Sequence, residues 1–139
     1  MTERIQDVMT QYPVTVGPLT SLTEAARRMR DADIGDVLIV DGERLDGVVT
    51  DRDLVVRGLA EGRDPNETTV HAVRSPDLVT VGPGDSLTMA AELMRAHALR
   101  RLPVTEDGRL VGIVTIGDLA IERDSDSALA DISAATANR

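Results

Sequence analysis

The chain contains an internal repeat. Residues 5–58 align with residues 70–123 at a constant offset of 65 positions without a gap, and 20 of the 54 aligned pairs are identical. Val14-Thr-Val-Gly-Pro18, for example, returns as Val79-Thr-Val-Gly-Pro83. A fixed period of this length indicates one supersecondary unit used twice. Each copy is too small to hold a core of its own, so we expect the two copies to pack face to face with paired clefts at their seam.

Both copies have the same order of expected elements. A turn of helix is followed by a strand, a helix that begins with a capping serine, a strand hairpin and a closing helix. The expected strands are residues 14–16, 37–40 and 45–50 in the first copy, and 78–81, 102–105 and 110–115 in the second. The closing helices are expected at 51–61, with Leu54, Val55, Leu59 and Ala60 turned inward, and at 116–123. The sequence therefore predicts an α+β fold of two pseudo-symmetric βαββα repeats packed sheet to sheet.

The repeat also divides the chain into segments. Gly62-Arg-Asp-Pro-Asn66 contains strong helix breakers and predicts a linker. The expected parts are a first repeat at 1–61, a linker at 62–69, a second repeat at 70–123 and a polar tail at 124–139.

Composition excludes several classes of function. The net charge is −9, which opposes binding to nucleic acid or to an anionic membrane. Tyr12 is the single aromatic residue, so there is no platform on which bases could stack. There is no cysteine and no apolar run long enough to span a membrane. We therefore expect a cytoplasmic protein that binds neither nucleic acid nor membrane.

Catalytic and metal chemistry find no support in the residues. His71 and His97 are far apart and have no second ligand at metal-binding spacing. No nucleophile and base can be placed together, and no phosphate-binding P-loop is present. The sequence predicts no catalytic residue, no metal ligand and no required cofactor, and hence no enzyme.

One motif occurs at equivalent points of both copies. Gly47-Val-Val-Thr-Asp-Arg-Asp53 and Gly112-Ile-Val-Thr-Ile-Gly-Asp118 each lie where an apolar strand gives way to a helix. Unpaired N–H groups and the helix dipole make such a point a natural seat for phosphate. Thr50 and Thr115 could donate to a phosphate, and the two aspartates could accept from ribose hydroxyls. Gly47 and Gly112 would let backbone approach a flat base, or would simply mark the start of a strand. Arg52 could add positive charge in the first copy.

A purely structural interpretation of the motif stays open beside this one. Thr-x-x-Asp is also a capping box, which stabilises a helix N-terminus without any ligand. Two equivalent occurrences favour a functional pair, but they do not exclude two well-capped helices.

Together, the repeat, the element order and the paired Gly-x-x-Thr-x-x-Asp motif resemble a tandem pair of CBS domains, or Bateman module. The segment from Met94 to Val104 before the second hairpin resembles the family too. The resemblance covers residues 5–123, and the chain looks like a stand-alone CBS-pair protein. Its layout also resembles, as a weaker match, the small actinobacterial stress- or hypoxia-associated members of that group. It implies regulatory binding of an adenosine-containing ligand: AMP, ADP, ATP, S-adenosylmethionine or a cyclic dinucleotide.

The resemblance also implies roles for particular residues. Thr50 and Asp53 would serve phosphate and ribose in one cleft, and Thr115 and Asp118 in the other. The first strand of each repeat carries Thr15 and Thr80 where family members hold the base, and Arg101 is placed to meet a phosphate.

The two copies differ at charged positions around the motif. Asp36 occupies the position equivalent to Arg101, and Gly117 the position equivalent to Arg52. A carboxylate beside a phosphate repels it. We therefore expect unequal clefts, with the second, which contains Arg101, the better phosphate site.

Two functional hypotheses follow. In the first, the chain is a regulatory sensor that binds an adenosine ligand between its repeats and signals by conformational change or by contact with a regulated partner. In the second, it is a structural or interaction scaffold that has lost ligand binding. CBS pairs commonly associate, so a homodimer is expected in either case.

Overall fold

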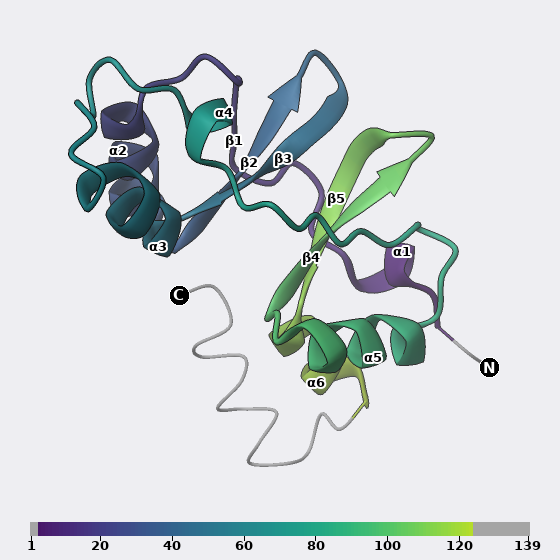
Figure 1. Cartoon of the computed structure of the whole chain (residues 1–139). Helices are drawn as coiled ribbons and strands as arrows, with labels where there is room; N and C mark the ends of the chain where they lie inside the picture. Colours follow the sequence, from purple (N-terminus) through teal and green to yellow (C-terminus); the bar gives the residue numbers. More distant parts are fainter. Residues whose placement is uncertain (1–2, 124–139) are drawn as a thin grey trace. The chain divides into compact units, whose positions relative to one another are not determined.

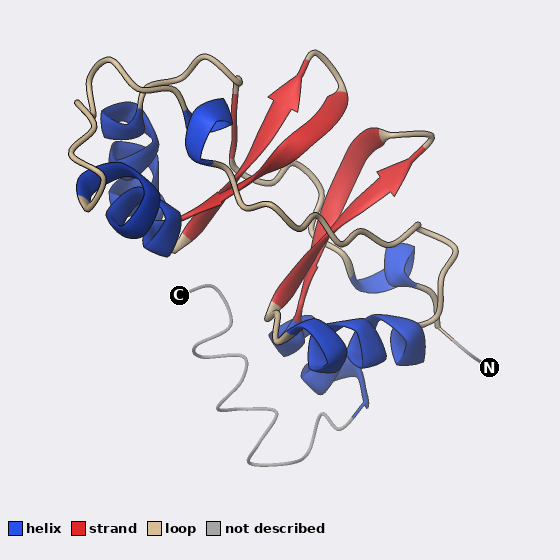
Figure 2. Cartoon of the chain, in the orientation of Figure 1, coloured by secondary structure: helices blue, strands red, loops and turns tan. Residues whose placement is uncertain are grey.

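The computed structural model describes residues 3–123, and the predicted tail at 124–139 lies outside the described residues. The chain contains both helices and strands, including two strand hairpins, as expected of an α+β fold (Figures 1 and 2). The helical segments are α1 (Ile5–Val8), α2 (Leu22–Ala32), α3 (Asp51–Asp53), the π-helix η1 (Leu54–Leu59), α4 (Val70–Val73), α5 (Leu87–His97) and α6 (Ile116–Arg123). The strands are β1 (Thr15–Val16), β2 (Asp36–Asp41), β3 (Arg44–Thr50), β4 (Arg101–Glu106) and β5 (Arg109–Thr115). The predicted fold class is confirmed.

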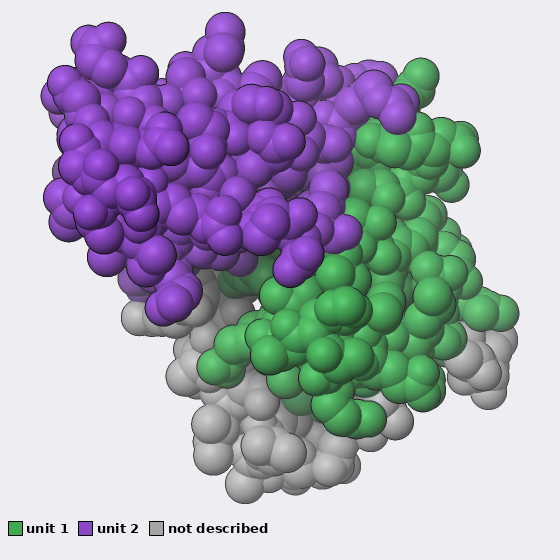
Figure 3. Space-filling view, in the orientation of Figure 1, with its two compact units in different colours: residues 1–13, 79–139 green, residues 14–78 purple. Residues whose placement is uncertain are grey.

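The chain forms two compact units whose borders differ from those of the sequence repeats (Figure 3). Unit 2 is the continuous segment Val14–Leu78, and unit 1 combines Met1–Pro13 with Val79–Arg139. Each repeat therefore gives its leading helical turn to the other repeat's unit. Helix α1 contacts α6, and α4 contacts β3 and η1.

In unit 2, a three-stranded sheet is covered by helices. Strand β1 pairs in parallel with β2, which pairs antiparallel with β3. Apolar residues from β1, β2, β3, α2 and α4 form one core. Its buried members are Val16, Leu22, Ala25, Met29, Val37, Ile39, Val49, Val70 and Val73. Burial of these aliphatic side chains is the main favourable term holding the unit together.

Unit 1 repeats this plan around the β4–β5 hairpin. Its buried core residues are Ile5, Val81, Leu87, Ala90, Met94, Leu102, Val104, Val114 and Leu119. Ile5 of α1 is completely buried, and its backbone N–H donates to Asp85 (3.0 Å). The N-terminal segment is therefore part of this core rather than an appendage of the first repeat.

The strand expected at 78–81 is not formed, and Pro103 explains why. Residue 81 makes a single parallel bridge with Val104. In unit 2, the Leu38 N–H donates to the Val14 carbonyl and extends the ladder (3.3 Å). The equivalent of Leu38 in the second repeat is Pro103, which has no N–H to donate. The prediction of a full strand here was wrong.

The expected inward face of the first closing helix was also wrong. Val55 is 55% exposed and Leu59 72% exposed, and Ala60 is exposed as well, while Leu54 is half-buried. The expectation assumed an α-helical period, but the Ala60 N–H donates to the Val55 carbonyl, five residues back (2.8 Å). The wider π turn changes which side chains face the core. It is Gly58 that is buried, where an added Cβ would lie 2.7 Å from Leu22.

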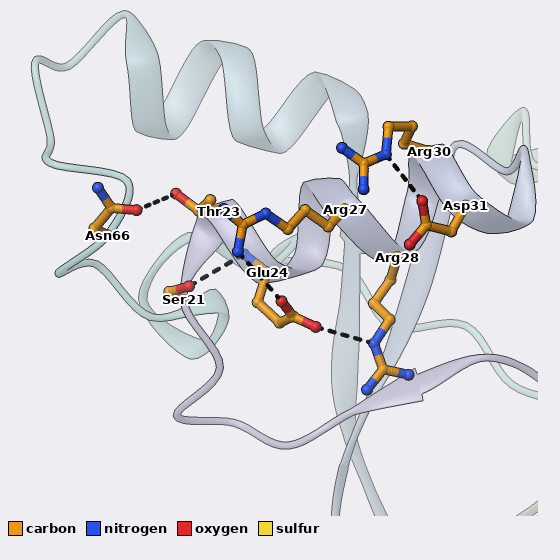
Figure 4. A network of polar contacts seen from close by, with 8 residues as sticks. All are labelled: Ser21, Thr23, Glu24, Arg27, Arg28, Arg30, Asp31 and Asn66. Atoms are coloured by element: carbon orange, nitrogen blue, oxygen red, sulfur yellow. Dashed lines mark hydrogen bonds and ion pairs between the residues drawn. The ribbon is translucent and has the colours of Figure 1, made fainter.

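Helix α2 is capped as expected and carries a polar outer face (Figure 4). The Ser21 hydroxyl accepts from the Glu24 N–H (3.1 Å). The Glu24 carboxylate pairs with Arg28 (3.3 Å), one turn along the helix. The side-chain hydrogen bond from Arg30 to Asp31, together with the charge of Asp31, raises the pKa of Arg30. These exposed pairs contribute little to stability, so the cap and the buried face hold this helix.

Candidate functional site

The Thr-x-x-Asp motif of the first repeat forms a closed capping box at the β3–α3 junction. The Asp53 N–H donates to Thr50 Oγ1 (3.0 Å), and the Thr50 N–H donates to Asp53 Oδ2 (2.9 Å). Asp53 is only 7% exposed. The capping interpretation is therefore correct for this copy, and it fixes the positions of both side chains.

The second copy forms the same box at the β5–α6 junction. The Asp118 N–H donates to Thr115 Oγ1 (3.1 Å), and the Thr115 N–H donates to Asp118 Oδ2 (2.8 Å). Thr115 is buried, and Asp118 is half-buried. The two motifs thus share one local geometry, in agreement with the sequence repeat.

Strand register places the charged positions beside the boxes. Asp36 pairs across the strands with Thr50, and Arg101 pairs across the strands with Thr115. Residues directly opposite in an antiparallel pair project to the same face. The expected equivalence of Asp36 and Arg101 is therefore real: one box has a carboxylate neighbour and the other a guanidinium neighbour.

Thr15 and Thr80, the residues expected to hold the base, lie in different units. Thr15 pairs with Leu38, two residues from Asp36 along β2, so it lies on the face of the sheet that carries Thr50. Thr80 precedes the buried Val81 and is half-buried. Arg52, in contrast, is exposed, and its backbone N–H donates to Asp51 (2.8 Å). The binding roles of these residues stay predictions.

The two motif glycines provide room for the segments that follow α4 and α1, which each repeat gives to the other repeat's unit. A Cβ on Gly47 would lie 2.8 Å from the Arg74 side chain, and a Cβ on Gly112 would lie 2.8 Å from Met9 and 2.9 Å from the Thr10 carbonyl oxygen. Close approach of protein segments therefore accounts for both glycines. The sequence could not show this, because it did not reveal which segment packs on which strand.

Asp53 has two further partners that sequence reasoning missed. The Ser75 hydroxyl donates to Asp53 Oδ2 (2.6 Å), and Arg57 Nε lies 3.3 Å from Oδ1. Arg57 could have been found from its spacing, because residues i and i+4 are neighbours on a helix. Ser75 follows α4 and reaches Asp53 only through the exchange of helical turns.

A histidine–carboxylate pair also lies in unit 2. His71 Nδ1 is 2.7 Å from Asp46 Oδ2, and the Arg74 guanidinium donates to the His71 carbonyl (2.7 Å). Within residues 3–123, no three His, Cys, Asp or Glu side chains are grouped so that they could hold a metal ion. Nor does any helix of that part of the chain have the length and apolarity needed to cross a membrane.

Comparison with known proteins agrees with the repeat. The CBS domain model matches residues 5–58 and again residues 70–124. The chain belongs to the CBS-domain family. It is 41% identical over 133 residues to the CBS domain-containing protein YhcV of Bacillus subtilis, with 93% of this chain and 94% of YhcV covered.

Two other relatives add detail. Hypoxic response protein 1 of Mycobacterium tuberculosis is 41% identical over 116 residues, covering 83% of this chain and 81% of that protein. A crystal structure of Hypoxic Response Protein I with two coordinated zinc ions superposes with a TM-score of 0.81 at 40% identity, covering 86% of this chain and 98% of the other. The structure of a hexameric CBS-CP12 protein from bloom-forming cyanobacteria has a TM-score of 0.72 at 26% identity, covering 89% and 74%. CBS pairs are commonly regulatory, and the CBS-CP12 protein among these relatives is hexameric.

Proposed function

We propose that this protein is a regulatory sensor that binds an adenosine-containing ligand, such as AMP, ADP, ATP or S-adenosylmethionine, and passes the signal on by conformational change or by contact with a cytoplasmic partner protein. The observation that carries the proposal is the duplicated Thr-x-x-Asp box, which has the same geometry at Thr50–Asp53 and Thr115–Asp118. A single box would be explained by helix capping alone.

Capping and ligand binding are compatible in such a box. The threonine oxygen accepts from the aspartate N–H, so the hydroxyl proton can still be donated to a phosphate oxygen. The cap occupies Asp118 Oδ2 (2.8 Å from the Thr115 N–H), which leaves acceptor capacity on the same carboxylate for ribose hydroxyls. Holding both side chains in place beforehand also lowers the entropic cost of binding.

Charge favours the box of the second repeat for a phosphate-bearing ligand. Arg101 is the cross-strand partner of Thr115, and arginine matches phosphate geometry with paired donors. The corresponding partner of Thr50 is Asp36, which would repel a phosphate. We therefore propose that phosphate binds beside Thr115. The difference in affinity between the Thr115 box and the Thr50 box should increase with the phosphate charge of the ligand.

Calorimetric titration with AMP, ADP, ATP and S-adenosylmethionine tests the sensor function. The expected result is saturable binding that is lost in Asp118→Ala. Arg101→Gln should weaken ATP more than S-adenosylmethionine, which has no phosphate. Arg100→Gln is the matched control, because Arg100 is the arginine next to Arg101 in the sequence and is exposed. Flat titrations with all four ligands, and then with cyclic dinucleotides, would refute the proposal.

A scaffold function is the second candidate, and an exposed apolar surface favours it. Val55, Val56 and Leu59 of η1 are 55%, 41% and 72% exposed. Apolar groups gathered on one element indicate a contact surface, and we propose a homodimer that uses it. Leu59→Asp should then lower the mass measured by light scattering at micromolar concentrations, whereas Leu19→Asp, at a still more exposed position elsewhere (83%), should not.

The zinc ions of the Hypoxic Response Protein I structure are not carried over to this proposal. His71 and Asp46 would supply two ligands, but the described residues offer no third His, Cys, Asp or Glu beside them. A structural zinc site requires four.

A further inference from the structure

The two equivalent aspartates differ in how much of their carboxylate is already used. A carboxylate offers about four lone-pair positions. Asp53 Oδ2 accepts from the Thr50 N–H (2.9 Å) and the Ser75 hydroxyl (2.6 Å), and Oδ1 faces Arg57 (3.3 Å). Asp53 is also buried. The remaining capacity is too small for two ribose hydroxyls.

Asp118 is in a different situation. Among residues 3–120, the group that donates to its carboxylate is the Thr115 N–H (2.8 Å). The offset of 65 makes Thr10 the equivalent of Ser75, and Glu122 the equivalent of Arg57. Thr10 is exposed, and its backbone forms both bonds of a bridge with Ile113 (2.8 and 2.9 Å). With respect to residues 3–120, the carboxylate of Asp118 therefore keeps acceptor capacity for a diol.

We propose that Ser75 acts as a latch that occupies the ribose-binding position of Asp53, so that one adenosine ligand binds per chain, at Asp118. The inference rests on the proposed function and adds a specificity-determining residue to it. Ser75 reaches Asp53 because the segment after α4 is bonded to β3, through the Ser75 N–H and the Val48 carbonyl (2.9 Å). The serine is thus held beside the carboxylate by backbone as well as by side chain.

A ligand at Asp53 would have to displace this hydroxyl. The bond is short and charge-assisted, and breaking it would leave a half-buried serine without its partner. The net contribution of such a bond corresponds to about a tenfold change in an equilibrium constant. Removing the hydroxyl should therefore strengthen binding at Asp53 by about tenfold, because the ligand no longer competes with it.

Titration calorimetry of S-adenosylmethionine into the full chain tests the latch. This ligand contains the ribose but no phosphate, so the repulsion expected from Asp36 does not hide the result. The wild-type protein should bind one equivalent, and Asp118→Ala should abolish this binding while Asp53→Ala leaves it. Ser75→Ala should bind two equivalents, the second of which is lost in Ser75→Ala/Asp53→Ala. Ser75→Thr keeps the hydroxyl and should retain the wild-type stoichiometry.

The outcomes separate the latch from the sensor function. One equivalent in both wild type and Ser75→Ala would overturn the latch but leave the sensor intact. Loss of the wild-type event in Asp53→Ala would overturn it as well, because Asp53 would then be the working residue. No binding of S-adenosylmethionine by any variant would overturn the opening of a site by Ser75→Ala, whereas the sensor function is overturned only if AMP, ADP, ATP and cyclic dinucleotides also fail to bind.

A measurement without ligand then shows whether the bond itself exists in solution. The denaturation midpoints of Ser75→Ala, Asp53→Ala and the double variant should be non-additive if the two side chains interact. Additive shifts would mean that they do not interact, which would overturn the latch independently of any ligand.

Discussion

Two glycines at equivalent positions offer a sharp test of the exchanged segments. Both Gly47 and Gly112 lie in strands and are buried, and neither has a positive φ, so alanine can adopt the backbone at either position. What differs is the neighbour of the added Cβ. At Gly47 the nearest atom is Cδ of Arg74, in a flexible side chain (2.8 Å), whereas at Gly112 the Thr10 carbonyl oxygen lies at 2.9 Å.

The magnitudes follow from what has to move. Replacing glycine by alanine at a compatible position stabilises by about 0.4–1 kcal/mol through the unfolded chain. Overpacking a fixed neighbour costs about 1–3 kcal/mol, and the Thr10 carbonyl is fixed because it accepts from the Ile113 N–H (2.9 Å). We expect Gly112→Ala to destabilise by roughly 1–2 kcal/mol. Gly47→Ala should change stability by less than about 0.5 kcal/mol, because Arg74 can rotate away.

Urea unfolding followed by circular dichroism measures both variants on the same scale. The slope of free energy against denaturant should be unchanged, so that midpoints compare stability directly. Equal destabilisation by the two substitutions, or a neutral Gly112→Ala, would refute the reasoning. Either result would mean that residues 9–10 do not pack on β5 as described.

Three further substitutions test local features. Ser21→Ala removes the α2 cap and should lower the free energy of unfolding in urea by about 1 kcal/mol. Ser21→Asp keeps a capping oxygen and should be nearly neutral, so equal losses of stability in the two variants would contradict the cap. Ala98 is the left-handed C-cap of α5 (φ 54°), and Ala98→Gly should stabilise the protein by roughly 0.5–1 kcal/mol, seen as a higher calorimetric midpoint. Asp33→Gly, at the equivalent C-cap of α2 (φ 56°), should stabilise it less, because aspartate tolerates this conformation. Leu102→Ala creates a cavity at a completely buried position and should cost about 2–5 kcal/mol, against less than about 0.5 kcal/mol for the exposed Leu19→Ala; similar values would place Leu102 outside the core.

Much of the fold could be predicted because the repeat supplies each element twice. The hairpins and the long helices begin and end within a residue or two of the expected positions, since apolar runs, capping serines and turn residues agree there. The π-helix could not be predicted, because the side chains of Val55 and Leu59 match an α-helical period that the backbone does not follow. Pro103 did carry a signal against the strand at 78–81, through its missing N–H.

The candidate site was predictable only as far as it is local in sequence. Both Thr-x-x-Asp boxes form, since the partners are three residues apart. The equivalence of Asp36 and Arg101 followed from the repeat, but their pairing with Thr50 and Thr115 did not, because the expected strands began one residue later. Ser75 could not be found, because a repeat alignment shows which residues are equivalent but not which copy each segment contacts. Its contact with Asp53 depends on that exchange.

The exchange of helical turns also has a consequence for the order in which the protein can be made. Unit 2 is one uninterrupted stretch, Val14–Leu78, so it is complete as soon as that stretch has left the ribosome. Unit 1 needs Ile5, which is synthesised early, to meet Leu119, which is synthesised late. With synthesis at about 5–20 residues per second, the early segment waits for seconds while unit 2 folds beside it. The chain is therefore built as one domain inserted into another, and the inserted domain can fold before the other is complete.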